Sequence, residues 1–295
     1  MSVLLCDSNG ELWHTRVKEL GLDYISMPYT LAGEEFYYDL GEKTDFEHFY
    51  GSVRGGEIPK TQALNPEDYK QILTPYFEKG EDVLYVSFSH KLSGTFAQLD
   101  AAYAELKERF PERKLTVFDT NSISLGAGIQ VEQAAILKQN GASDEDILNF
   151  LKDFTNRVCV YFVVDDLMHL KRGGRCSGFA AFAGTVLGLK PMLSVDEDGG
   201  LKVLAKLGGR KKAISTLAQK VVDELTDEDK YSVYVVDADC KEEGDKLRDL
   251  ILKKRPDAHV VRQIVGPVIG AHCGPGTLGV IFIGKQRPVP LKNVD

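Results

Sequence analysis

The stretch Val83-Leu-Tyr-Val-Ser-Phe-Ser-His-Lys-Leu-Ser-Gly-Thr-Phe96 decides the fold. Its first six residues form the apolar run that is typical of a strand buried on both faces of a parallel sheet. A short polar loop follows, and Ser93-Gly94-Thr95 opens a helical pattern that continues to Phe110. A strand that passes through a short loop into a helix predicts one unit of an α/β fold.

The same alternation of short apolar runs and amphipathic stretches extends over the first half of the chain. It predicts a parallel sheet with helices on both sides. The segment Tyr29–Gly41 is aromatic and weakly periodic, and we expect it to be a covering loop. Further strands are expected at Val3–Asp7, Tyr24–Pro28 and Leu115–Thr120, and helices at Glu11–Leu20, Thr44–Val53, Pro66–Lys79, Gly94–Phe110, Leu125–Asn140 and Asp144–Asn156.

The second half is richer in strands. The runs Lys190–Val195 and Lys202–Leu207 flank a Gly-containing turn and predict an antiparallel hairpin. We therefore predict an α/β fold with a three-layer α/β/α parallel-sheet domain over residues 1–157, a smaller mixed-sheet α/β domain over 158–285 and a loose tail over 286–295. The other strands are expected at Val158–Val164, Tyr231–Asp237, His259–Val265 and Gly279–Ile283, and helices at Ser177–Leu187, Lys211–Thr226 and Glu242–Lys254.

Composition excludes several classes of protein. The 295 residues carry a net charge of −8, which argues against a nucleic-acid binder because phosphate contacts need a basic surface. No run approaches the roughly 20 apolar residues of a membrane helix, and the first residues lack the basic region of a signal peptide. Five scattered cysteines without a CxxC motif fit a reducing compartment. We expect a cytoplasmic protein without a metal.

The loop before the predicted helix at Gly94 is the first candidate site. Unpaired N–H groups and the positive end of the helix dipole attract an anion there, and the Ser93 and Thr95 hydroxyls can donate to it. An equally good interpretation is that Ser93 only caps the helix. A nucleophilic serine is less favoured, since the GxSxG motif is absent.

Four other segments carry polar groups. Phe118–Gly128 also lies where a strand meets a helix, and its polar side chains either support the first loop or cap a helix. Thr61 lies between Pro59 and Pro66, in an extended segment that would present it at a fixed point. Leu167–Arg175 is a basic glycine turn, and Ala271–Gly276 places His272 on a Gly/Pro loop that is expected to be rigid and exposed.

Taken in order, these segments resemble the DegV family, and in particular its fatty-acid-binding members that serve a fatty-acid kinase. The resemblance covers nearly the whole chain. It consists of Asp7-Ser8, Ile58-Pro-Lys-Thr61, Leu92-Ser-Gly-Thr95, Asp119-Thr120 with Ser124, Gly126 and Gly128, Leu170-Lys-Arg-Gly-Gly-Arg175 and His272-Cys-Gly-Pro-Gly276.

The resemblance implies a non-enzymatic subunit that binds a long-chain fatty acid, with no cofactor. It implies that Thr61, Ser93 and the Gly94 amide hold the carboxylate while the acyl chain is buried. A separate ATP-dependent kinase would convert the carboxylate to acyl phosphate for phospholipid synthesis, and contact with a membrane would be at most transient. Positions matching the ligand mouth or its surroundings are Gln62, Thr95, Thr120, Asn121, Ser122 and His272, and those matching the docking face are Arg172, Arg175 and Arg210.

Two positions depart from the family pattern. Gln62 stands where a second hydroxyl residue is usual, and Gly208 and Gly209 interrupt a segment that is often more basic. Two other functions stay open from the residues alone. One is a serine hydrolase or acyltransferase that uses Ser93 with His90 or His272, and the other is a phosphate-ester-binding protein.

Overall fold

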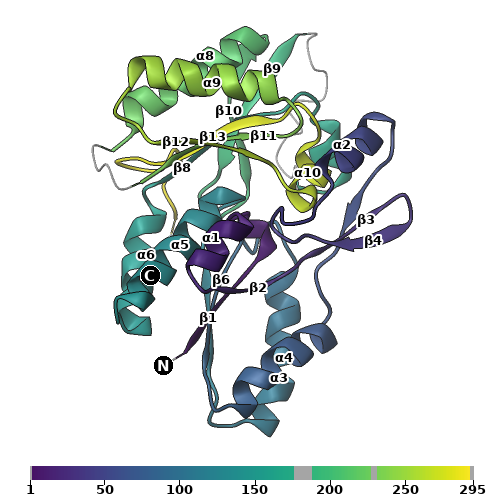
Figure 1. The fold of residues 1–295 in the computed structure, drawn as a ribbon, viewed down its shortest axis with the longest axis vertical. Helices are drawn as coiled ribbons and strands as arrows, with labels where there is room; N and C mark the ends of the chain where they lie inside the picture. The colour runs from purple at the N-terminus through teal and green to yellow at the C-terminus, as the bar shows by residue number, and fades with distance from the viewer. Residues whose placement is uncertain (1, 176–187, 227–230, 293–295) are drawn as a thin grey trace.

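The computed structural model describes residues 2–175, 188–226 and 231–292, and two large sheets organise them (Figure 1). The first sheet has four parallel strands in the order β2-β1-β6-β7. These strands are β1 (Val3–Asp7), β2 (Asp23–Ile25), β6 (Val83–Ser87) and β7 (Leu115–Asp119). All five residues of β6 are buried, as its apolar sequence predicts.

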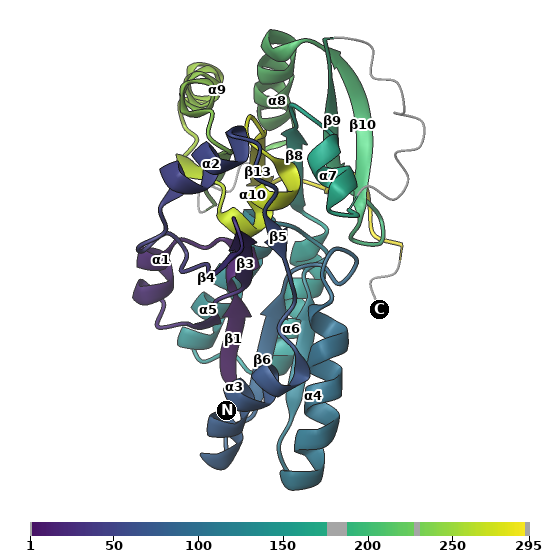
Figure 2. The ribbon, with the colours of Figure 1, turned by 90° about the vertical axis from the view of Figure 1, so that its right-hand side faces the viewer.

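Two pairs of helices cover this sheet on opposite sides (Figures 1 and 2). One pair is α3 (Pro66–Glu78) with α4 (Thr95–Arg109), and the other is α5 (Leu125–Gln139) with α6 (Asp144–Thr155). Asn65 caps α3 in a reciprocal capping box, with Pro66 in the first turn. The predicted α/β/α arrangement with a parallel sheet is confirmed.

The second sheet is mixed, with the order β10-β9-β8-β13-β11-β12. Only β11 and β12 pair in parallel, and the predicted hairpin is β9 with β10. Helices α8 (Arg210–Glu224) and α9 (Lys241–Lys254) cover one face. The strands are β8 (Val158–Val163), β9 (Leu189–Val195), β10 (Leu201–Gly208), β11 (Val233–Asp237), β12 (Val260–Ile264) and β13 (Leu278–Ile283).

The two faces of the second sheet serve two different cores. In β8, Cys159, Tyr161 and Val163 pack under α8 and α9, whereas Val160 and Phe162 belong to the core shared with the first sheet. This alternation follows the two-residue period of a strand. The second sheet therefore presents an apolar face toward the carboxyl ends of the first.

The segment expected to be a covering loop is instead a small sheet. β3 (Pro28–Leu31) and β4 (Glu34–Tyr37) form a hairpin, and β5 (Lys60–Thr61) pairs with β3. The hairpin turns at Gly33, whose φ of +86° is readily available only to glycine. The expected strand Tyr24–Pro28 is accordingly split, since β2 ends at Ile25 and Pro28 begins β3. Helix α2 (Phe46–Arg54) follows the hairpin.

Two segments expected to be turns are short helices, and one expected helix starts late. Met168–Arg172 forms α7, and Pro267–Cys273 forms α10, with proline in its first turn. His272 therefore lies in the last turn of α10 and not on a loop. Helix α1 (His14–Glu19) starts after Glu11, because Ser8–Gly10 form a separate 3-10 turn. The predicted helix Ser177–Leu187 lies outside the described residues.

The segment after β13 is not loose as far as residue 292. Arg287 is 4% exposed, and its backbone N–H donates to the Asn156 carbonyl at 2.7 Å. Its guanidinium donates to the carbonyls of Asn121, which follows β7 of the first sheet, and Asp196, which follows β9 of the second. These contacts tie the end of the described chain across both halves of the molecule. The boundary at residue 157 stays a prediction.

A close approach between α5 and the 3-10 turn gives a stability prediction. A Cβ on Gly128 would fall inside the van der Waals distance of the Gly10 carbonyl oxygen, which is backbone and cannot move aside. Gly128→Ala should therefore lower the free energy of unfolding by about 2 kcal/mol in urea titrations. Gly51→Ala in α2, where a Cβ meets nothing, should leave it unchanged or raise it. Equal stabilities of the two variants would contradict this packing.

Candidate ligand-binding site

A cavity lies between the two sheets, at the carboxyl ends of the first. Such strand ends are where α/β sheets commonly bind ligands. Val160 of β8 and Ile281 of β13 line the cavity from the second sheet, and Phe88, Ser93 and Ile123 line it from loops of the first. Its volume for the centres of water-sized molecules is about 130 Å³. This is well above the ~10–15 Å³ that admits one water, so the space is open and not solidly packed.

The cavity is mostly apolar and has a polar, partly exposed end. Val160, Val236 and Ile281 are buried apolar walls. By contrast, Thr61 and Ser93 are half-buried and Gly94 is exposed. An elongated ligand with one polar end fits this distribution of side chains.

Backbone and hydroxyl donors meet at the start of α4. Gly94 occupies the N-cap position, and no side chain caps the helix there. The Ser93 Oγ lies 2.9 Å from the Thr95 Oγ1 and accepts only a long hydrogen bond, 3.3 Å, from the Thr95 N–H. Within the described residues, no acceptor is bonded to the Gly94 N–H. The start of α4 therefore keeps donors available for an anion.

Thr61 is held beside His272. Strand β5 pairs Thr61 with Tyr29, and the Thr61 Oγ1 lies 2.7 Å from the His272 Nε2. Burial, with a smaller effect of the Arg175 charge, lowers the pKa of His272 to about 4. His272 is therefore neutral at pH 7. When its Nε2 carries the proton and donates to Thr61, the Thr61 hydroxyl hydrogen is left for a ligand.

The lowered pKa of His272 predicts an acid-dependent loss of stability. In the unfolded chain the pKa is 6.5, so between pH 6.5 and 4 the unfolded state binds more protons than the folded state. The stability that the folded state keeps while His272 is neutral is therefore fully present above pH 6.5 and is lost as the pH falls to 4. The free energy of unfolding of the wild type should drop by about 3 kcal/mol more than that of His272→Gln across this range. If denaturant titrations showed the free energies of unfolding of the two proteins changing in parallel with pH, this prediction would be refuted.

Arg175 lines the cavity, and its expected part in docking a partner stays a prediction. Its Nε donates to the Leu92 carbonyl at 3.0 Å, just before Ser93. Burial lowers the pKa of Arg175, but an arginine side chain stays charged in proteins. The polar end of the cavity thus contains a guanidinium as well as hydroxyl and amide groups. This favours an anionic head group.

The other residues expected near the mouth divide into two groups. Gln62 lines the cavity, although its exposed Nε2 donates to Glu35 at 2.7 Å. Thr120, Asn121 and Ser122 do not line it, because the chain turns so that Ile123 and Ser124 form the wall. Ser122 instead accepts the Ser89 N–H, and Asn121 bonds to Asp119.

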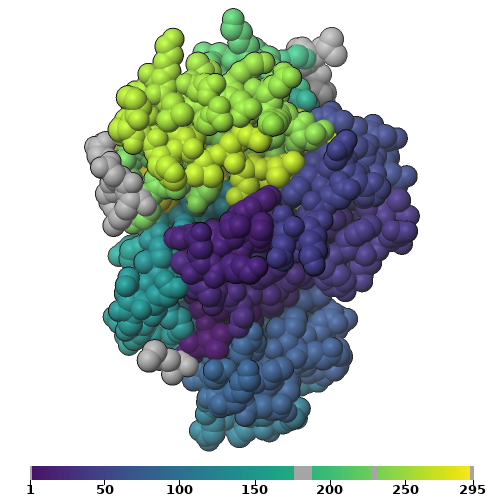
Figure 3. Space-filling model, viewed as in Figure 1, coloured from purple at the N-terminus to yellow at the C-terminus, as the bar shows by residue number. Residues whose placement is uncertain are grey.

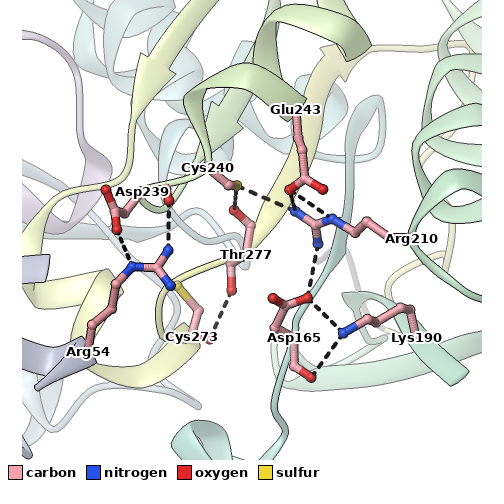
Figure 4. Close-up of polar contacts among 9 residues, drawn as sticks. All are labelled: Arg54, Asp165, Lys190, Arg210, Asp239, Cys240, Glu243, Cys273 and Thr277. Atoms are coloured by element: carbon pink, nitrogen blue, oxygen red, sulfur yellow. Dashed lines mark hydrogen bonds and ion pairs between the residues drawn. The ribbon is translucent and has the colours of Figure 1, made fainter. Parts of the chain in front are cut away.

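The residues expected to dock a partner differ in their availability. Arg172 is exposed on α7. Arg210, in contrast, is paired with Glu243 at 2.6 Å and lies 3.5 Å from Asp165, which also pairs with Lys190 (Figure 4). Figure 4 also shows Arg54 of α2 paired with Asp239 across the two halves. Arg210 is thus engaged within the second half of the chain.

No base activates Ser93 in the described part of the molecule. His90 is bonded to Asp119, His272 to Thr61, and the Ser93 hydroxyl to Thr95. A serine hydrolase needs a base within hydrogen-bond reach of its nucleophile. This arrangement disfavours the hydrolase alternative. Within the same residues, no group of three or more His, Cys, Asp or Glu side chains could hold a metal, and no helix is both long and apolar enough to cross a bilayer.

The sequence analysis assigned no role to two buried acids. Glu11 is 1% exposed and accepts from the Ser124 hydroxyl and the Gly266 N–H, so it ties the starts of α5 and α10 together. Burial raises its pKa to about 8. Asp7 is also buried, at the end of β1. The only signal in the sequence is that both acids flank a short polar break between apolar runs.

A second hollow lies on the face shown in Figure 3, between α1, α5 and the edge strand β12, with a volume of about 670 Å³. Its main charged groups are already paired, Arg16 with Glu132 at 2.6 Å and Arg262 with Asp237. Among the described residues that line it, these charges are therefore not free to select a ligand.

Comparison with known proteins agrees with the fold. Residues 3–285 match the family model described as the DegV family of uncharacterised proteins. A DegV domain-containing protein of Clostridium perfringens is 34% identical over 285 residues, covering 97% of this chain and 98% of the relative.

Solved structures give the same result. A fatty-acid-binding DegV family protein from Thermus thermophilus superimposes with a TM-score of 0.84 at 30% identity, over 96% of this chain and 99% of that one. DegV of Bacillus subtilis, a fatty acid binding protein, superimposes with a TM-score of 0.80 at 29% identity, over the same shares. Because the family model matches residues 3–285, nearly the whole chain, the chain belongs to the DegV family.

Proposed function

We propose that the protein binds a long-chain fatty acid, with the carboxylate at Thr61, Ser93 and Gly94 and the acyl chain in the cavity between the sheets. The observation that carries this proposal is the mostly apolar cavity with a cluster of hydroxyl, amide and guanidinium donors at its partly exposed end. The fatty acids bound by the Thermus thermophilus and Bacillus subtilis proteins support the same ligand class.

The two ends of the ligand have different roles. Burial of the acyl chain contributes about 0.8 kcal/mol per methylene before entropy and strain are subtracted. Each hydrogen bond to the carboxylate contributes about 1.5–3 kcal/mol. The chain therefore supplies most of the affinity, whereas Thr61, Ser93 and Gly94 determine which end faces outward.

The exposed position of the head group suits presentation to a second protein. We propose that a separate ATP-dependent kinase subunit phosphorylates the bound carboxylate, giving acyl phosphate for phospholipid synthesis in the cytoplasm. The chain itself would then be a non-enzymatic subunit. Its sequence contains no GxxxxGK[ST] phosphate-binding loop, and Arg172, exposed on α7, is a candidate contact for the kinase.

Titration with four ligands tests the binding proposal. Delipidated protein should bind hexadecanoate, and hexadecyl phosphate and short phosphate esters should not outcompete it. Tight binding of phosphate esters without binding of hexadecanoate would favour the phosphate-ester alternative and reject the proposal. Hexadecanol serves as the ligand without a carboxylate.

The kinase step needs its own assay. Protein loaded with hexadecanoate should form acyl phosphate only when ATP and the partner kinase are both present, which hydroxylamine trapping detects as a hydroxamate. Formation of the hydroxamate with ATP and this chain alone would show that the chain is itself the enzyme.

A further inference from the structure

Tyr69 carries a buried hydroxyl without a partner. The side chain lies in α3 and is 0% exposed, and its hydroxyl makes no hydrogen bond within the described residues. Buried polar groups nearly always have a partner, so this one calls for an explanation. The hydroxyl lies beside those of Thr95 and Tyr85, without completing a hydrogen bond to either. Thr95 is the direct neighbour of the proposed carboxylate site.

On one side of Tyr69, the hydrogen bonds are fixed. The Tyr85 hydroxyl donates to the Asp7 carboxylate at 2.6 Å, and the Ser87 hydroxyl donates to the same oxygen at 2.8 Å. Since Asp7 Oδ2 accepts both hydroxyls, the single hydrogen of the Tyr85 hydroxyl is committed to Asp7. Tyr85 can therefore accept from Tyr69 but cannot donate to it.

On the other side, the direction of one hydrogen bond decides what Ser93 can offer. The Ser93 and Thr95 hydroxyls are 2.9 Å apart, and either oxygen can be the donor. If Ser93 donates to Thr95, its only hydrogen is used and none is left for a ligand. If Thr95 donates to Ser93, the Ser93 hydrogen is free to point at a carboxylate. Thr95 is buried, so its oxygen then needs a donor from inside the protein.

We propose that Tyr69 is a positioning residue for the head group: it donates to Thr95, Thr95 donates to Ser93, and Ser93 donates to the ligand carboxylate. This inference rests on the proposed fatty-acid site. The chain of three hydroxyls points every hydrogen toward the anion, and each link strengthens the next by polarisation. In the ligand-bound protein, the Tyr69 hydroxyl then moves within hydrogen-bond reach of Thr95 and gains the partner that it lacks here.

Tyr69→Phe tests the inference, because it removes one oxygen and keeps the ring. The variant should bind hexadecanoate about five- to tenfold more weakly than the wild type and bind hexadecanol within about twofold. Thr95→Val, which keeps the shape of the side chain, should have the same selective effect. In a Ser93→Ala background, Tyr69→Phe should cause no further loss, since its effect passes through Ser93.

Tyr38→Phe is the matched control. Tyr38 is another fully buried tyrosine with an unpartnered hydroxyl, and it does not line the cavity. Tyr38→Phe should change the affinity for neither hexadecanoate nor hexadecanol. Both tyrosine variants should be at least as stable as the wild type in urea.

The outcomes separate this inference from the proposed function. Unchanged hexadecanoate affinity in Tyr69→Phe, or equal losses for hexadecanoate and hexadecanol, would overturn the positioning role. If Tyr69→Phe gives either of these results while the wild type binds hexadecanoate and Ser93→Ala weakens that binding, only the role of Tyr69 fails. If the wild type binds no fatty acid at all, the proposed function fails first.

Discussion

Octanoate should bind roughly four orders of magnitude more weakly than hexadecanoate. The two ligands share a carboxylate and differ by eight methylenes, each worth about 0.8 kcal/mol when buried, so the difference approaches about 6 kcal/mol. The cavity walls that would cover these methylenes are buried apolar side chains such as Val160, Val236 and Ile281. Competition against a fluorescent fatty acid, run below the critical micelle concentration of each ligand, measures the ratio.

The size of this ratio distinguishes two kinds of site. If head-group recognition dominated, octanoate and hexadecanoate would differ by less than about tenfold. Such a result would mean that the cavity between the sheets does not take up the chain. Dodecanoate should fall between the two, because the contribution of each methylene is roughly constant.

Removal of both head-group hydroxyls should cause the second large effect. Thr61→Val and Ser93→Ala each remove one donor, and the double variant should lose about 3–6 kcal/mol in hexadecanoate affinity, or roughly two to four orders of magnitude. Binding of hexadecanol should change far less, since its uncharged head group gains less from the same donors.

Two features of the structure qualify this second prediction. His272 is bonded to Thr61, and Thr61→Val leaves the His272 Nε2 without that partner. Arg175 remains at the polar end of the cavity and can still attract the carboxylate. Ser215→Ala is the control: it removes an exposed hydroxyl that donates to the nearby Lys212 carbonyl, and the variant should bind as the wild type does. If the double variant retained full affinity, the head group would not bind at these hydroxyls.

The fold was accessible from the sequence wherever burial leaves a strong local pattern. Strand β6 is buried on both faces, and its sequence is one apolar run. The start of α3 is indicated by Asn65 at the cap and Pro66 in the first turn. Helix α10 was missed because its seven residues are too few to show a helical period, and Gly270 together with the flanking Gly266 and Gly274 resembles a loop. The β3–β4 hairpin was missed because its buried and exposed residues do not alternate: Tyr29 packs on Phe49 of α2, and Phe36 stacks on Tyr29.

The site was accessible only in part, because its contacts join distant segments. Ser93 and Gly94 can be predicted from a strand that enters a helix. The contact of Thr61 with His272 spans 211 residues, and nothing local in either segment indicates it. Arg175 looks like a solvated turn residue in the sequence, and only the folded chain brings it beside Ser93 through Leu92. Tyr69 looks like an ordinary core aromatic until its hydroxyl is seen to lack a partner.

Native mass spectrometry of the freshly purified protein tests the central claim most directly. We expect a population heavier than the bare chain by the mass of one fatty acid of about 16 to 18 carbons, released on denaturation and identified in the extract. That adduct should be depleted in the Thr61→Val, Ser93→Ala double variant. A chain that carries no lipid as purified and takes up none from added hexadecanoate would contradict the claim.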